Sequence, residues 1–305
     1  MGLAHAIRRF PRGIGVLALL AGLLSGLSEG GHAEGEAGLS DPEHGKYVFQ
    51  LAGCLGCHTD SANGGEVLAG GRALELPFGT FITPNITPDP VTGIGTWSLR
   101  DFILALREGL SPDGDYYYPA FPFDHYTQMS DGDVAALYGY LMARPAVTIR
   151  AADHDLAFPF NIRQGLVLWR TLYFEPGPRP DDSLSPELAR GRYLTDALSH
   201  CGACHTPRTL LGGPIESLYL AGNPHGPEGD SVPNITPDPT TGLGNWTDDD
   251  LGLLVKVGVF PDGDVVSGSM AEVVREGTRH LSDNDLAAML AWLRHIPPVE
   301  NDPKP

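Results

Sequence analysis

The pattern of apolar and polar positions along this chain predicts short helices separated by long polar loops, and the pattern occurs twice. Each expected helix begins at an N-cap residue. The first copy places these caps at Asp41, Ser98 and Ser130, and the second at Ser185, Thr247 and Ser282. The second helix of each copy is expected to end at a glycine, Gly109 or Gly258. No segment shows the alternation of a strand, so we expect an all-α fold.

Long stretches of the first copy recur almost unchanged in the second, which indicates a tandem duplication. The stretch PNITPDPVTGIGTW at 84–97 returns as PNITPDPTTGLGNW, 149 residues later, and CLGCH at 54–58 returns as CGACH, 147 residues later. We therefore expect one domain over residues 34–143 and another over 185–305. The linker, residues 144–184, contains a predicted helix at 161–174 whose apolar face is expected to pack against the domains.

The first 33 residues have the composition of a secretory signal peptide. Three arginines lie within residues 1–13, an apolar run follows at 14–24, and small residues lead to Ala33. We expect export to the periplasm, with an uncleaved membrane anchor as the alternative. Removing residues 1–33, which hold three arginines and one glutamate, changes the formal charge from −18 to −20. Such an acidic chain is not expected to bind nucleic acid.

All four cysteines belong to two C-x-x-C-H motifs in a chain addressed outside the cytoplasm, which is typical of c-type haem attachment. Two thiols one helical turn apart can bond one porphyrin, and the next imidazole then lies under the iron. The predicted covalent attachment residues are Cys54, Cys57, Cys201 and Cys204, and the predicted proximal iron ligands are His58 and His205. A zinc site or a redox dithiol is the alternative, but no further cysteine exists to complete a zinc site.

An electron-carrying haem needs a second axial ligand, and methionine sulfur is a common choice. In the second copy Met270 is the predicted ligand, on a loop before the last helix, whereas Met289 lies inside that helix and is interpreted as packing. The first copy has Phe121 at the place of Met270. We therefore predict that Met129 binds the first iron, with His125 as the second choice and a vacant iron as the third.

Two smaller features have mainly structural interpretations. The N-I-T sequences at 85–87 and 234–236 match a glycosylation sequon, but each threonine precedes a proline. We interpret them as turn chemistry and leave open a contact with haem propionates. The other histidines, His44 and His200 among them, are interpreted as surface or hydrogen-bonded side chains.

The chain resembles the c-type cytochrome subunits of bacterial membrane-associated alcohol, gluconate and fructose dehydrogenases, and related dihaem cytochromes c. The shared sequences are CxxCH, TPNITPDPxTGIGxW, ALREG, DGxxYYPAFPF, ALYGYL and GSMAEVV. The resemblance implies two tandem cytochrome c-type haem domains with two covalently bound haem c groups. It favours Met129 and Met270 as ligands, because the family places a methionine after PAFPF and in GSMAEVV. The family subunits usually carry three haem motifs and a membrane-contacting segment, whereas this chain has two motifs.

The expected function is that of a periplasmic dihaem cytochrome c rather than an enzyme. It would carry electrons from a dehydrogenase to a respiratory acceptor, which could be a cytochrome, an oxidase or a quinone-linked protein. Association with a membrane is expected only through such partners. The alternative function is that of a dihaem peroxidase or small-molecule oxidoreductase with an open coordination site at the first haem.

Overall fold

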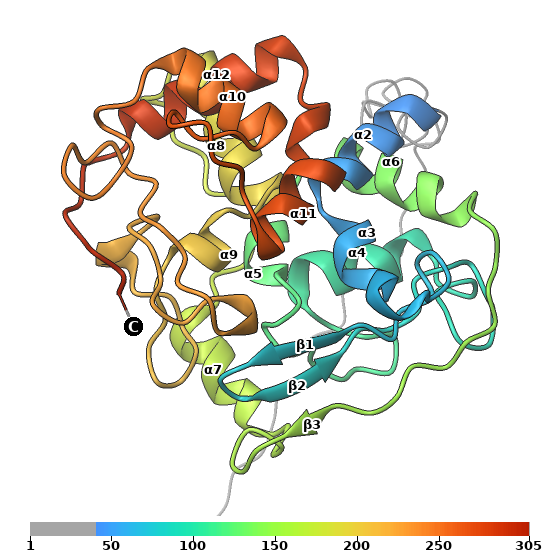
Figure 1. Cartoon of the computed structure of the whole chain (residues 1–305). Coiled ribbons are helices and arrows are strands. Elements are labelled where there is room, and N and C mark those ends of the chain that lie inside the picture. Colours follow the sequence, from blue (N-terminus) through green and yellow to red (C-terminus); the bar gives the residue numbers. More distant parts are fainter. Residues whose placement is uncertain (1–40, 305) are drawn as a thin grey trace, which may run out of the picture.

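Helices form most of the regular structure in the computed structural model, which describes residues 41–304. The predicted signal peptide lies outside the described residues. The first copy of the repeat, drawn in blue and green, lies beside the second copy, drawn in yellow to red (Figure 1). Within the described range, no helix has the length and apolarity needed to cross a bilayer.

The helices of the two copies follow the same order. The first copy contains α2 (Pro42–Leu51), α3 (Cys54–His58), α4 (Leu99–Glu108), α5 (Phe123–Tyr126) and α6 (Asp131–Met142). The second contains α8 (Pro186–Tyr193), the π turn η2 (Leu194–Leu198), α9 (Gly202–His205), α10 (Asp248–Val257), α11 (Gly268–Glu276) and α12 (Asp283–His295). Helix α7 (Gly165–Tyr173) lies between the copies in sequence, and short 3₁₀ turns occupy Ser61–Asn63, Glu216–Leu218, Pro227–Gly229 and Thr278–His280.

The first and last helices of each copy cross in close contact, α2 against α6 and α8 against α12. A glycine lies at each crossing. A Cβ atom added to Gly45 would lie 2.4 Å from the carbonyl oxygen of Ala136, and one added to Gly191 would lie 1.9 Å from that of Ala288. Only glycine permits this approach of one helix to the backbone of the other.

The predicted caps are confirmed, and the aspartates near them have two different uses. Ser98 with Asp101 and Thr247 with Asp250 form complete capping boxes, in which side chain and backbone bond each other reciprocally. At the start of α6 and α12 the serine cap accepts its backbone bond, as expected. The aspartates at the third position of α6 and α12 contact the opposite copy.

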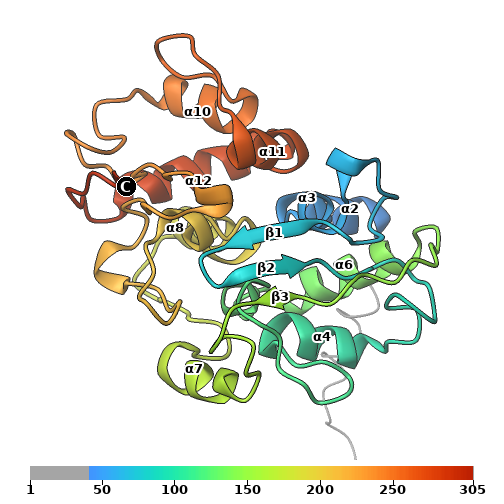
Figure 2. The same cartoon turned by 60° about the horizontal axis from the view of Figure 1, so that its bottom comes forward.

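The all-α expectation is wrong in one place, because a small antiparallel sheet covers part of the first copy. Its strands, in the order β1, β2, β3, are Ala73–Leu76, Gly79–Ile82 and Asp155–Leu156 (Figure 2). Gly79 adopts φ 127° at the hairpin turn and lies against Asp155 of β3. Strands of four and two residues are too short for an alternating pattern to be recognised.

The segment predicted as a linker is less separate from the first copy than expected. It supplies β3 to the sheet of that copy. Helix α7 begins at Gly165 rather than at residue 161, and it packs through Leu166 and Trp169, which are buried. Only one face of α7 is covered, since Val167, Leu168 and Leu172 are exposed.

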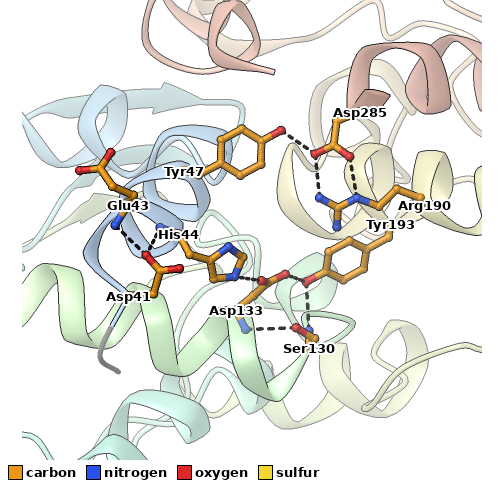
Figure 3. Close-up of polar contacts among 9 residues, drawn as sticks. All are labelled: Asp41, Glu43, His44, Tyr47, Ser130, Asp133, Arg190, Tyr193 and Asp285. Carbon is orange, nitrogen blue, oxygen red and sulfur yellow. Dashed lines mark hydrogen bonds and ion pairs between the residues drawn. The ribbon is translucent and has the colours of Figure 1, made fainter. Parts of the chain in front are cut away.

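Two tyrosine–aspartate hydrogen bonds join the copies in a reciprocal arrangement (Figure 3). Tyr47 of α2 donates to Asp285 of α12 at 2.5 Å, and Tyr193 of α8 donates to Asp133 of α6. Each tyrosine oxygen also accepts from the backbone amide of the serine that caps the opposite helix, at 3.2 and 3.0 Å. The contact is self-complementary, as in a twofold dimer interface.

Each of these aspartates has a second partner from its own copy, and the two partners differ. Arg190 holds Asp285 through two bonds of 2.8 and 2.7 Å, whereas His44 contacts Asp133 through one nitrogen at 2.7 Å. Burial alone would raise the pKa of Asp285, but hydrogen bonds from Arg190 and Tyr47 outweigh it and hold the pKa below its ordinary value. This carboxylate therefore stays charged at the interface.

Replacing Tyr47 or Tyr193 by phenylalanine is expected to lower the free energy of unfolding by about 1–2 kcal/mol, because each change removes one hydrogen bond to a carboxylate. Urea denaturation of Tyr47→Phe, Tyr193→Phe and the double variant measures this. Tyr138→Phe is the control, since Tyr138 donates to Trp97 within the first copy. Unchanged denaturation midpoints in all interface variants would contradict the role of the contact.

Candidate functional site

The four cysteines lie in two pairs, each on one short helical turn. Cys54 and Cys57 belong to α3, and Cys201 caps α9, which contains Cys204. All four, which fall within the described range, are free thiols. The C-x-x-C spacing thus places the two cysteines of each motif about one helical turn apart in both copies.

The environment of these thiols does not suit a redox dithiol. Burial raises the pKa of Cys54 and Cys201 to about 12, and that of Cys204 to about 11. Dithiol enzymes instead rely on a lowered cysteine pKa. Within residues 41–304, no group of three or more His, Cys, Asp or Glu side chains could hold a metal ion. Neither the dithiol nor the zinc interpretation therefore gains support.

The histidine that ends each motif is oriented by a proline carbonyl. Nδ1 of His58 lies 2.8 Å from the carbonyl oxygen of Pro84, and Nδ1 of His205 lies 2.8 Å from that of Pro233. A carbonyl only accepts, so Nδ1 must carry the proton and Nε2 keeps its lone pair. Burial lowers the pKa of both histidines, which favours the neutral imidazole. A neutral ring with a free Nε2 is the form that binds a metal.

The repeated N-I-T loop holds these prolines in place. Asn85 follows Pro84 and donates to the carbonyl oxygen of Val147 at 2.7 Å; Asn234 donates in the same way to Val299 at 2.7 Å. Both asparagines are buried, and their Oδ1 atoms accept from the threonine two residues later. The structure assigns these side chains to the loop, which agrees with turn chemistry and leaves them inaccessible to glycosylation.

A glycine brings the chain back against each motif. The amide of Gly70 donates to the carbonyl oxygen of His58 at 2.9 Å, and the amide of Gly222 donates to that of His205 at 2.7 Å. Both glycines have left-handed backbones, with φ of 73° and 92°. A Cβ at Gly70 would lie 2.6 Å from the carbonyl oxygen of Pro84. The histidine, its proline and this glycine form one packed unit.

The two methionines that the sequence predicts as iron ligands lie in different local structures, one on a loop and one in a helix. Met129 lies on the loop before α6, as predicted, and its side chain is buried. Met270 lies in the first turn of α11, so its predicted loop position is wrong. The residues after Met270 are mostly good helix formers, and they extend the helix to include it. Phe121, at the equivalent place, packs against the rings of Tyr117 and Tyr126 at 5.8 and 5.7 Å.

His125, the second choice for the first iron, lies beside the other copy. Its Nδ1 lies 2.9 Å from the carbonyl oxygen of Asp196. Its Cε1 lies 3.2 Å from the point where a Cβ of Gly202 would be. The ring therefore contacts the second C-x-x-C-H motif.

Two arginines that the sequence analysis missed connect each motif to the opposite copy. Arg72 donates to the carbonyl between the two cysteines of the first motif and forms a 2.6 Å ion pair with Glu272 of α11. Arg208 donates to the equivalent carbonyl of the second motif at 3.4 Å and lies 4.0 Å from Asp124 of α5. The arginines occupy unrelated positions in the two copies, so the repeat gave no signal for them.

Comparison with known proteins identifies similar chains. The chain is 43% identical over 269 residues to a dihaem cytochrome c-type protein of Cereibacter sphaeroides, covering 87% of this chain and 89% of the relative. It is 37% identical to the gluconate 2-dehydrogenase cytochrome c subunit of Pantoea cypripedii, covering 92% of this chain and 65% of the subunit. It is 40% identical to the fructose dehydrogenase cytochrome subunit of Gluconobacter japonicus, covering 83% and 52%. The chain thus spans about half to two thirds of these dehydrogenase subunits. No family model matches it.

Gly70→Ala is expected to destabilise the protein more than Gly71→Ala. Both changes place a side chain on a left-handed backbone, at about 1–2 kcal/mol. A Cβ at Gly70 would also collide with Thr83 and Pro84, whereas one at Gly71 meets nothing within 4 Å. The difference between their free energies of unfolding, from chemical denaturation, measures how firmly Pro84 is held. If both variants lost the same free energy of unfolding, Pro84 would not be held firmly, because the backbone around His58 would have moved to accommodate the added methyl group.

Proposed function

We propose an electron-transfer function for this chain, which belongs to the family of dihaem c-type cytochromes that includes the cytochrome c subunits of gluconate, fructose and alcohol dehydrogenases. One observation carries the proposal. In both copies a pair of free cysteines is followed by a histidine whose Nδ1 is bonded to a carbonyl and whose Nε2 is free. We infer that each motif attaches one haem c, through Cys54 and Cys57 in the first copy and through Cys201 and Cys204 in the second.

The residues around each motif suit a haem group, and each has a definite role in holding it. Haem bound at these motifs supplies a one-electron iron couple. His58 and His205 would hold the iron through Nε2, and the proline carbonyls keep both rings from turning.

Met129 and Met270 are our proposed second axial ligands. Burial keeps the Met129 thioether away from water, and helix α11 gives Met270 a defined direction. Phe121 has no ligand atom, so the first copy needs a ligand from another position. The position of His125, bonded to Asp196 beside the second motif, favours Met129 over His125 for the first iron.

We propose that each copy is one haem domain, residues 34–143 and 185–305, joined by residues 144–184. The matched helix crossings and the matched histidine–proline bonds support this division. Strand β3 ties the connecting segment to the first domain. The reciprocal tyrosine–aspartate bonds would then be the contact between domains.

We propose that residues 1–33 direct export to the periplasm, where the protein accepts electrons from a dehydrogenase. The names of the relatives, several of them dehydrogenase subunits, support such a donor. The acceptor would be a cytochrome, an oxidase or a quinone-linked protein. The net charge of −20 that remains once residues 1–33 are removed favours partners with a basic docking surface. Contact with the membrane would be made through these partners.

The exported protein is expected to contain two covalent haems. Changing Cys54 and Cys57 to serine should remove one of them, and changing Cys201 and Cys204 should remove the other, because each pair forms its own thioethers. Intact mass and the absorbance of the pyridine haemochrome per mole of protein measure this. A wild-type chain with the mass of the unmodified polypeptide would end the proposal.

Met129→Ala and Met270→Ala are each expected to change one haem only. Loss of the sulfur should lower the midpoint potential of that haem and add a high-spin component to its EPR spectrum. Met289→Leu is the control. Met289 is buried on α12, and leucine there keeps the apolar volume of the side chain while removing the sulfur. Unchanged spectra and potentials in Met129→Ala would refute its assignment. A high-spin first haem in the wild type would instead favour an enzyme with an open iron.

A further inference from the structure

The two C-x-x-C-H motifs approach each other where the copies meet. Gly53 immediately precedes Cys54, and the point where its Cβ would lie is 3.7 Å from Nε2 of His200. His200 in turn immediately precedes Cys201. The pKa of Cys204 is raised chiefly by burial, and nearby Cys57 raises it further. The attachment residues of one copy are therefore neighbours of those of the other.

His200 is the asymmetric residue of this contact. Gly53 and His200 occupy equivalent positions, 147 residues apart, and both have a left-handed backbone, with φ of 66° and 38°. Glycine adopts this conformation freely, whereas another residue pays about 1–2 kcal/mol. A strained residue persists only where its surroundings impose the conformation, and such residues cluster at functional sites.

The side chain of His200 fills the space between the motifs. Its ring lies 5.4 Å from the ring of Tyr126 and 6.3 Å from that of His125, both of the first copy. The groups that face it from the packed elements also include Asp124 of α5, and Cys54 and Cys57 lie near Tyr126. Burial, with His125 adding to it, lowers the pKa of His200 to about 4, so the ring is neutral near neutral pH.

We propose that His200 positions the two haem groups for electron exchange with each other, and that its imidazole is the contact through which the two attachment motifs are coupled. The inference rests on the proposed function, since both motifs must carry haem. The exchange moves one electron: one iron passes from ferrous to ferric while the other passes from ferric to ferrous. No bond is made or broken and no proton moves.

The covalent route between the motifs explains why this residue matters. From Cys201 the route runs along the backbone to the His200 ring, whose Nε2 lies 3.7 Å from the point where a Cβ of Gly53 would be. It then crosses the through-space gap to the backbone of Gly53 and continues to Cys54. Electron transfer through protein slows steeply as through-space gaps widen. Removing the imidazole replaces this contact by a longer gap. The ion pairs of Arg72 with Glu272 and of Arg208 with Asp124 also connect each motif to the opposite copy.

The test is His200→Gly in the full, haem-loaded protein. Glycine relieves the backbone strain and reproduces the residue found at Gly53, so folding should be retained. In half-reduced protein, the rate of electron exchange between the haems, followed after a flash or pulse, is expected to fall severalfold. The visible spectra and midpoint potentials of both haems should not change. His225→Gly is the control, because His225 is exposed and, among residues 41–304, its hydrogen bond is made by its backbone amide.

A second variant distinguishes the effect of the imidazole ring from that of the backbone conformation. His200→Asn tolerates the left-handed conformation and fills part of the space of the imidazole, so it should give an intermediate rate. An unchanged rate in haem-loaded His200→Gly would overturn the proposal, and so would shifted potentials or spectra, since His200 would then be shaping a haem pocket. A wild-type protein without haem would overturn the proposed function itself, which haem quantification before the kinetics reveals.

Discussion

The hydrogen bond between each motif histidine and a proline carbonyl is the constraint on which the site depends. By engaging Nδ1, the carbonyl leaves Nε2 as the only nitrogen that can bind a metal. The carbonyl can do this only because it cannot move. Asn85 and Asn234, each next to its proline, tie the loop to the segment that follows the last helix of the copy. The stretch that recurs most exactly in the two copies therefore fixes the orientation of the histidine, although the loop lies far from the histidine in sequence.

Duplication also determines how the two copies meet. Because equivalent residues occupy equivalent places, a tyrosine of one copy that reaches an aspartate of the other is matched by the reverse pair. Such a contact places two carboxylates at a partly buried interface, and each needs hydrogen bonds and a cation nearby. Arg190 supplies a cation and two hydrogen bonds to Asp285, whereas His44 contacts Asp133 through one ring nitrogen.

The two copies also differ from each other in several places. The sheet of the first copy, with a strand from the connecting segment, has no counterpart in the second copy within the described residues. Phe121 packs with tyrosine rings, whereas its equivalent Met270 lies on a helix. At the contact between the motifs, Gly53 faces His200. The duplication thus preserves the support of each histidine, while the residues at the equivalent positions 121 and 270 and the contact between motifs have diverged.

The sequence by itself determined the local features, because their causes are local. The C-x-x-C-H motifs, the caps at Ser98 and Thr247 and the ends at Gly109 and Gly258 all depend on residues a few positions apart, and the repeat is visible as the same letters in two places. The loop position of Met129 followed in the same way. Only the tertiary structure decided which distant groups meet. The carbonyl of Pro84 lies 26 residues from His58, and Tyr47 is separated from Asp285 by 238. Packing across the two copies brings such groups together, and no periodicity along the chain records it.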